Sequence, residues 1–217
     1  MRQGRVRVNG APVSDPEWPV RQGIDKVSVD GAEQAGGVER LIVMLNKPRG
    51  LVTTTHDEQG RDTVYTCFAG SGLPWLAPAG RLDKASEGLL LFSNDPQWNA
   101  ALTDPQRGPH KTYHVQINRL PDAALLQDLV QGVTVEDEFL RATAASLLRQ
   151  GDKNAWLAIE LDEGRNRQIR RLLSAFDIRV LRLIRVAIGG LQLGELAKGQ
   201  WRRLSAADTQ ALSNASR

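Results

Sequence analysis

One stretch constrains the fold of this chain more than any other: a charged loop, Gly80-Arg81-Leu82-Asp83, leads into an apolar run over residues 88–92. A short apolar run next to turn residues is typical of a strand buried inside a sheet. A loop carboxylate that is braced against such a strand, with a guanidinium nearby, can be held as a reactive anion. Taken alone, the four-residue loop favours a salt-bridged turn, and the longer stretch that follows it shifts the interpretation towards a functional site.

The sequence from residue 41 onward predicts strands and helices that do not alternate regularly. Residues 112–117 alternate between polar and apolar side chains, as a half-buried strand does. We expect further strands over residues 41–45, 155–161, 180–186, 191–193 and 201–204, and helices over residues 96–102, 122–131 and 166–176 and after Ser205. Because several strands follow one another without a helix between them, the pattern favours an α+β fold with a mixed, mostly antiparallel central sheet.

The first part of the chain, residues 1–37, is predicted to be a small β unit with a linker, and residues 38–217 form the main domain. Asn9-Gly10 and Asp30-Gly31 are hairpin turns between alternating segments, and residues 34–37 are a plausible linker. The unit resembles the second half of a small RNA-binding module that tyrosyl-tRNA synthetases share with one small-subunit ribosomal protein. Either that module is degenerate here, or the chain begins too late to include its helices, or the unit is a plain hairpin that covers the main domain.

Charge is distributed unevenly along the 217 residues. The net charge is only +3, yet residues 165–203 contain ten basic side chains against two acidic ones. Apolar residues alternate with these cations, so we expect the cations to be displayed on ordered elements as a polyanion-binding face. The distribution indicates a nucleic-acid partner.

Other features exclude whole classes of protein. No apolar run approaches the roughly 20 residues that span a bilayer, and the N-terminus lacks the apolar core of a secretory signal. A single cysteine, Cys67, excludes an internal disulfide and a multi-cysteine metal site. We therefore expect a cytoplasmic protein without a membrane partner, and the default oligomeric state is a monomer.

Three motifs resemble those of the RsuA-type family of ribosomal RNA pseudouridine synthases. The loop and strand over residues 79–95 resemble the family's signature, Lys111-Thr112-Tyr113 resembles its basic-x-Tyr motif, and residues 161–172 resemble its third motif. The resemblance implies the pseudouridine synthase fold and the isomerisation of uridine to pseudouridine in ribosomal RNA. It implies no cofactor and no metal, because the reaction consumes no redox equivalent or phosphate donor.

The resemblance also implies catalytic residues. Asp83 is the carboxylate that attacks the nucleotide or stabilises a glycal-like intermediate, and Tyr113 stacks on the target base. Arg170 pairs with Asp83, with Arg165 as the second candidate for that pairing, and Ile169 packs near the base.

Further cations are expected to contact the substrate. A guanidinium, either Arg81 or a more distant arginine, would oppose the rise in the Asp83 pKa that burial causes. Arg167 and Arg171 lie one helical turn apart and suit phosphate ligands. The remaining candidates for contacts with RNA are Lys47, which is otherwise an exposed turn cation, Lys111, Arg182 and Arg185.

The sequence leaves the substrate open among several RNAs. Large-subunit ribosomal RNA is favoured, either free or in a ribosome-assembly particle, and small-subunit ribosomal RNA and tRNA are the alternatives. A non-catalytic RNA-binding protein for ribosome assembly would present the same basic face. The set of Asp83, Tyr113 and Arg170 favours the enzyme, because a binding protein has no need for a carboxylate that faces an anionic ligand.

Overall fold

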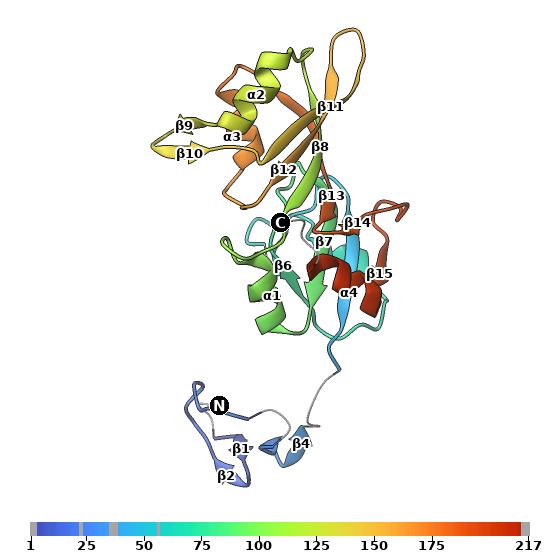
Figure 1. Ribbon diagram of the computed structural model, residues 1–217. Helices are drawn as coiled ribbons and strands as arrows, with labels where there is room; N and C mark the ends of the chain where they lie inside the picture. The colour runs from blue at the N-terminus through green and yellow to red at the C-terminus, as the bar shows by residue number, and fades with distance from the viewer. Residues whose placement is uncertain (1–3, 22–23, 35–38, 56, 214–217) are drawn as a thin grey trace. The chain divides into compact units, whose positions relative to one another are not determined.

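The computed structural model describes residues 4–21, 24–34, 39–55 and 57–213, which fall into two compact units, Met1–Arg40 and Leu41–Arg217 (Figure 1). Most of the predicted linker, residues 35–37, lies outside the described residues. None of the helices in the described ranges has the length and apolar character needed to cross a membrane.

The first unit is a four-stranded antiparallel sheet in the order β2-β1-β3-β4. Its strands are β1 (Val6–Val8), β2 (Ala11–Pro12), β3 (Val27–Val29) and β4 (Ala32–Gln34). The predicted turns are present, because Asn9 and Gly10 both have positive φ angles, of 50° and 82°, as a tight hairpin turn requires. Six basic and six acidic residues balance within residues 1–40, so charge does not mark this unit as a phosphate-binding module.

The second unit is built on one nine-stranded sheet in the order β11-β12-β8-β13-β7-β5-β15, with β6 added to β7 and β14 added to β13. Only β7 and β13 run parallel, so the predicted α+β fold with a mostly antiparallel sheet is confirmed. The strands are β5 (Ile42–Lys47), β6 (Ala77–Ala79), β7 (Glu87–Ser93), β8 (Lys111–Ile117), β11 (Ala144–Gln150), β12 (Ala155–Leu161), β13 (Val180–Ile188), β14 (Leu191–Gln192) and β15 (Trp201–Arg203).

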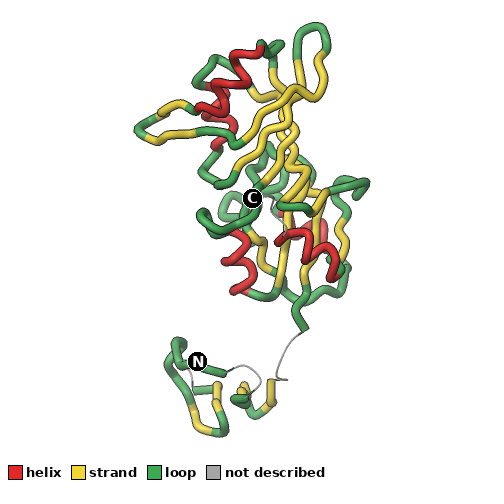
Figure 2. The backbone as a smooth tube through the Cα atoms, viewed as in Figure 1, coloured by secondary structure: helices red, strands yellow, loops and turns green. Residues whose placement is uncertain are grey.

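Helices lie beside both halves of this sheet, as Figure 2 shows. Helices α2 (Ala123–Gln131) and α3 (Gln168–Ser174) accompany β8, β11 and β12, whereas α1 (Pro96–Thr103) and α4 (Ala206–Ser213) accompany the half that contains β6, β7 and β14. A short 3-10 helix, η1 (Val64–Phe68), and a separate hairpin, β9 (Val133–Val135) with β10 (Glu138–Leu140), complete the unit.

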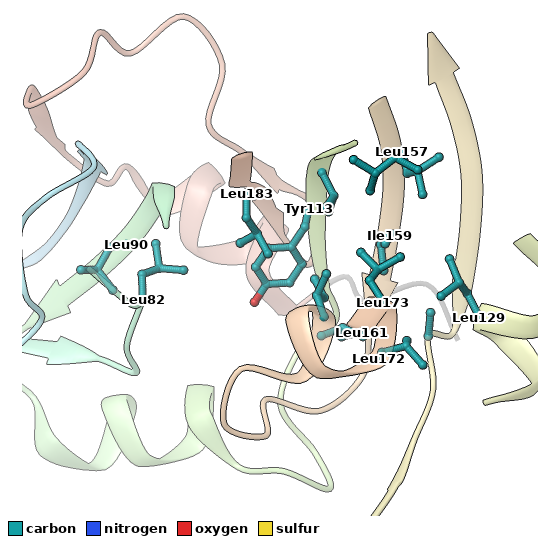
Figure 3. Close-up of a cluster of buried hydrophobic side chains, with 14 of the residues drawn as sticks. Leu82, Leu90, Tyr113, Leu129, Leu157, Ile159, Leu161, Leu172, Leu173 and Leu183 are labelled. Atoms are coloured by element: carbon teal, nitrogen blue, oxygen red, sulfur yellow. The ribbon is translucent and has the colours of Figure 1, made fainter. Parts of the chain in front are cut away.

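Local sequence signals explain where several elements begin and end. The Asp122 carboxylate accepts a hydrogen bond from the Leu125 amide at 2.8 Å and caps α2, and Gly132 ends that helix with a φ of 88°. Strands β5 and β7 are buried at every position, as the uninterrupted apolar runs predict. The larger apolar core extends along the sheet, from helices α2 and α3 to strands β5 and β7 and the 3-10 helix η1, and Figure 3 shows part of it.

The structure differs from the sequence expectation at three places. Strand β5 continues through Asn46 and Lys47, which were expected in a turn. Helix α3 begins only at Gln168, because Arg167 adopts a left-handed conformation with a φ of 50°. The hairpin β9–β10 and the edge strand β11 were not predicted, since β11 is exposed at almost every position and shows no alternation of burial.

The two halves of the sheet meet at a narrow junction. Strands β7 and β13 pair only through Ile184 with Glu87 and Arg185 with Gly88. Gly88 has a φ of +103°, and a β-carbon built there would lie 2.2 Å from the Arg185 carbonyl oxygen. Glycine is therefore required at this junction for both its conformation and its lack of a side chain.

This junction predicts a large effect of Gly88→Ala on stability. We expect the substitution to lower the free energy of unfolding by roughly 3–5 kcal/mol, because it adds a backbone clash to the cost of a positive φ, as measured by urea denaturation. Gly50→Ala is the matched control, since Gly50 has the same φ with nothing within 4 Å of the added carbon. Equal losses in the two variants would show that the close approach of β13 is not the cause.

Candidate active site

The loop that carries Asp83 joins β6 to β7, and its backbone is held by side chains from distant segments. The Lys47 ammonium group at the end of β5 donates to the carbonyl oxygens of Asp83, at 3.1 Å, and Ser86, at 2.8 Å, and also to that of Pro48. Lys47 is completely buried. Burial lowers its pKa to about 8, although the negative charges of Asp83 and Glu87 oppose that shift.

Every carbonyl from residue 82 to residue 86 accepts a hydrogen bond. The Thr53 hydroxyl donates to Leu82, the Gly50 amide donates to Lys84, and the Arg170 guanidinium donates to Ala85, at 2.7, 2.8 and 3.2 Å, while Lys47 serves the other two. A loop in which every carbonyl has a partner loses little further freedom when a substrate binds. The sequence did not reveal these anchors; a lysine at the end of an apolar run was the one available signal.

The Asp83 side chain leaves this fixed backbone and remains 36% exposed. Its carboxylate lies 3.6 Å from Nη1 of Arg167, so the ion pair expected with Arg170 or Arg165 is formed instead by Arg167. The left-handed conformation of Arg167, just before α3, places its side chain at this position. No hydrogen bond or ion pair joins Arg81 to Asp83 among the described residues.

Arg170 lies close to Asp83 but is bound elsewhere. Its guanidinium donates to the carbonyl oxygens of Ala85 and Val180. Burial is the main cause that lowers its pKa, and the nearby Asp83 carboxylate raises it. Arg170 therefore supports the loop backbone next to the reactive carboxylate rather than pairing with it. Arg165 pairs with Glu163 and Glu138, at 2.7 and 3.1 Å.

A pocket of about 490 Å³ opens beside Asp83, within the size range of ligand sites. Tyr113 of β8 lines it and is only 8% exposed. In Figure 3 the tyrosine ring lies beside Leu183, and its hydroxyl group points away from Ile159. Ile169 also lines the pocket. The predicted residues Asp83, Tyr113 and Ile169 therefore meet at one cavity.

The pocket wall is strongly basic. Its charged residues are two acidic ones, Asp83 and Glu163, and six basic ones, Arg81, Lys111, Arg165, Arg167, Arg170 and Arg185. Burial lowers the pKa of Lys111, and the Arg185 charge lowers it further. A shallower hollow of about 390 Å³, lined by Arg167, Arg170, Ser174 and Arg179 among others, shares two of these arginines. Such a wall suits a polyanionic ligand.

Three predicted RNA ligands have structural partners instead. Lys47 is buried beneath the loop and cannot reach a ligand at the surface. The Arg171 guanidinium pairs with Glu138 and donates to the Val135 carbonyl, so it holds the β9–β10 hairpin against α3.

Arg182 is the third of these residues. Its guanidinium forms two hydrogen bonds with the Glu87 carboxylate, at 2.7 and 2.9 Å, and Lys198 adds a contact of 2.7 Å. The hydrogen bond from Arg182 is the largest cause that lowers the pKa of Glu87, to about 2. This ion-pair network lies at the junction of β7 and β13, so Arg182 contributes to the sheet rather than to a free basic surface.

The site has no group of side chains arranged to hold a metal. Among the described residues, no three histidine, cysteine, aspartate or glutamate side chains gather in a way that could bind an ion. The pocket presents the Asp83 carboxylate, the buried tyrosine Tyr113 and several cations. This combination can bind an anionic ligand and present a nucleophile or base to it.

Comparisons with known proteins agree on one family. Residues 41–175 match the model of the family described as RNA pseudouridylate synthase. A ribosomal large subunit pseudouridine synthase E from Xanthomonas campestris is 38% identical over 178 residues, which cover 75% of this chain and 94% of that protein. A ribosomal large subunit pseudouridine synthase B from Bacillus subtilis is 33% identical over 218 residues, which cover 98% of this chain and 86% of that protein.

A solved structure agrees with these sequence relatives. The crystal structure of a pseudouridylate synthase with 30% sequence identity covers 97% of this chain and 90% of that chain, with a TM-score of 0.71. The matched region, residues 41–175, contains Asp83, Tyr113 and Arg170. Arg182 and Arg185 lie beyond it.

The anchoring of the loop predicts the effect of Lys47→Met. The variant keeps most of the side-chain volume but removes the Lys47 donor from three carbonyl groups, so we expect the free energy of unfolding to fall by about 2–4 kcal/mol. Because the backbone of Asp83 then moves, kcat should fall on the order of 10²-fold with a smaller change in KM. Urea denaturation and steady-state kinetics measure the two effects.

Lys153→Met, at an exposed loop position, is the control for the loss of a lysine charge. An unchanged kcat in Lys47→Met would contradict the anchoring role of Lys47.

Proposed function

Since the chain belongs to the RNA pseudouridylate synthase family, we propose that it isomerises a specific uridine to pseudouridine in large-subunit ribosomal RNA. The observation that carries this proposal is the Asp83 carboxylate, which is partly exposed at a basic pocket, on a loop whose carbonyls from residue 82 to residue 86 all accept hydrogen bonds. The names of the sequence relatives support ribosomal RNA of the large subunit as the substrate. That substrate implies that the enzyme works in the cytoplasm, on free RNA or on a ribosome-assembly particle.

The reaction requires a carboxylate but no cofactor. The bond between ribose C1′ and uracil N1 breaks, the base turns, and a new bond forms between C1′ and C5. C5 then loses its proton and N1 gains one, so no atom or electron is gained or lost overall. The Asp83 carboxylate either attacks C1′ or takes the proton from C2′ to give a glycal, and the Arg167 side chain lies 3.6 Å from this carboxylate.

The pocket can hold a base that has been pulled out of its stack. Uridine in folded RNA must leave the helix before its C1′ becomes accessible, and such pockets commonly offer an aromatic ring and flanking cations. Tyr113 lines the pocket and would supply that ring. The exposed Arg167 and Arg179 border the neighbouring hollow, where phosphates on either side of the target nucleotide would lie.

A test of the proposal uses Asp83→Asn, which removes the nucleophile and keeps the size of the side chain. Pseudouridines are mapped in ribosomal RNA from cells that lack the gene and from the same cells restored with wild type or variant. We expect one large-subunit uridine to lose its modification and to regain it only with wild type, while the purified variant keeps its RNA affinity within about threefold.

Other outcomes of that mapping would change the proposal in specific ways. If the modification is lost in small-subunit ribosomal RNA or in tRNA, the proposed reaction stands and the proposed substrate is replaced by that RNA. Full restoration by Asp83→Asn would remove Asp83 from the chemistry. If no RNA changes its modification while the wild-type protein still binds ribosomal RNA, the protein is a binding factor and not a synthase for that RNA.

A further inference from the structure

Arg185 is the buried charge that neither the ion-pair networks nor the roles above account for. It is 5% exposed, lines the pocket, and lies in β13 directly across from Tyr113 of β8. Its Nε donates to the Leu89 carbonyl oxygen at 2.8 Å, whereas its Nη2 is buried without a hydrogen-bond partner. The sequence predicted that Arg185 lies on an RNA-facing surface, but the side chain is buried.

The charges around Arg185 make its isolation unfavourable. The other arginine expected on that surface, Arg182, forms two hydrogen bonds with a carboxylate, but the ion pairs of the described residues include none for Arg185. Its neighbour in the pocket is a second cation, Lys111, whose ionisation it opposes. A buried guanidinium donor without an acceptor is costly and rare in folded proteins. An occupant of the pocket that brings an oxygen acceptor would offset that cost.

The position of Arg185 indicates which part of the substrate supplies the acceptor. The pocket is also lined by Tyr113, Leu183 and Ile169, whose buried apolar surfaces suit a flat base. Phosphate groups are better served by the exposed arginines at the rim, such as Arg167. The acceptor that reaches Arg185 is therefore an oxygen of the base.

We propose that Arg185 is a catalytic residue that binds a carbonyl oxygen of the target uracil and stabilises the base as it leaves the sugar. This assignment rests on the proposed function. When the bond between C1′ and N1 breaks, its electron pair stays on the uracil, and the negative charge is shared between O2 and O4. A fixed cation at one of these oxygens is more strongly attracted in the transition state than in the bound uridine, which accelerates the reaction.

The proposal distinguishes Arg185 from Asp83 in its effect on the reaction. Asp83 acts on the sugar, whereas Arg185 acts on the leaving base. A substrate whose base leaves more readily should therefore depend less on Arg185. 5-Fluorouridine is such a substrate, because fluorine withdraws electrons and stabilises the uracil anion.

The test measures single-turnover loss of the target nucleoside, by nuclease digestion and chromatography, in RNAs that carry uridine or 5-fluorouridine at the target. For Arg185→Gln we expect the rate with uridine to fall on the order of 10²-fold or more, with RNA affinity changed less than about threefold. With 5-fluorouridine the loss should be at least about tenfold smaller. Arg185→Lys, which keeps the charge, should recover part of the rate with uridine.

Arg182→Gln is the matched control, because it removes a neighbouring arginine of the same strand together with its Glu87 hydrogen bonds. Any loss in this variant should be equal for the two RNAs. Should Arg185→Gln not fold, Arg185→Lys must itself lose less rate with 5-fluorouridine than with uridine. Equal losses with the two RNAs, or no loss, would overturn the role of Arg185. A wild-type protein that converts neither RNA would instead overturn the proposed function, and the assignment of Arg185 with it.

Discussion

The site depends on a buried ammonium group, that of Lys47, beneath the loop of Asp83. Three backbone carbonyls surround it, two of which belong to the loop. Burial disfavours its charge, yet the charge strengthens each hydrogen bond that it donates. The loop is thus fixed from below by Lys47, while Thr53, Gly50 and Arg170 bind the remaining carbonyls. This arrangement fixes the loop backbone while the Asp83 side chain faces the pocket.

The basic character of the chain is divided between structure and substrate binding. Three of the arginines form ion pairs with carboxylates of the protein: Arg165 with Glu163, Arg171 with Glu138, and Arg182 with Glu87. The cations left for RNA are those at the pocket and its rim, among them Arg167 and Arg179. The resulting positive potential is concentrated where a phosphate backbone would approach Asp83, which favours productive binding over general adhesion to RNA.

Sequence reasoning succeeded where the information was local. The apolar run of β7, the alternation of β8, and the cap at Asp122 each predicted an element that the structure contains. It was wrong where the partner of a side chain is remote: Lys47 binds carbonyls 36 and 39 residues away. The predicted partner of Asp83 was also wrong. The left-handed backbone at Arg167 brings this arginine to the carboxylate, and no sequence signal revealed that conformation.

The most direct test of this account is a crystal structure of Asp83→Asn bound to an RNA that contains the target uridine. The account predicts that the target nucleotide leaves its helix and places its base against Tyr113, with C1′ next to the side chain of residue 83 and the flanking phosphates beside Arg167. A base that remains stacked in the RNA, or that lies outside this pocket, would contradict it.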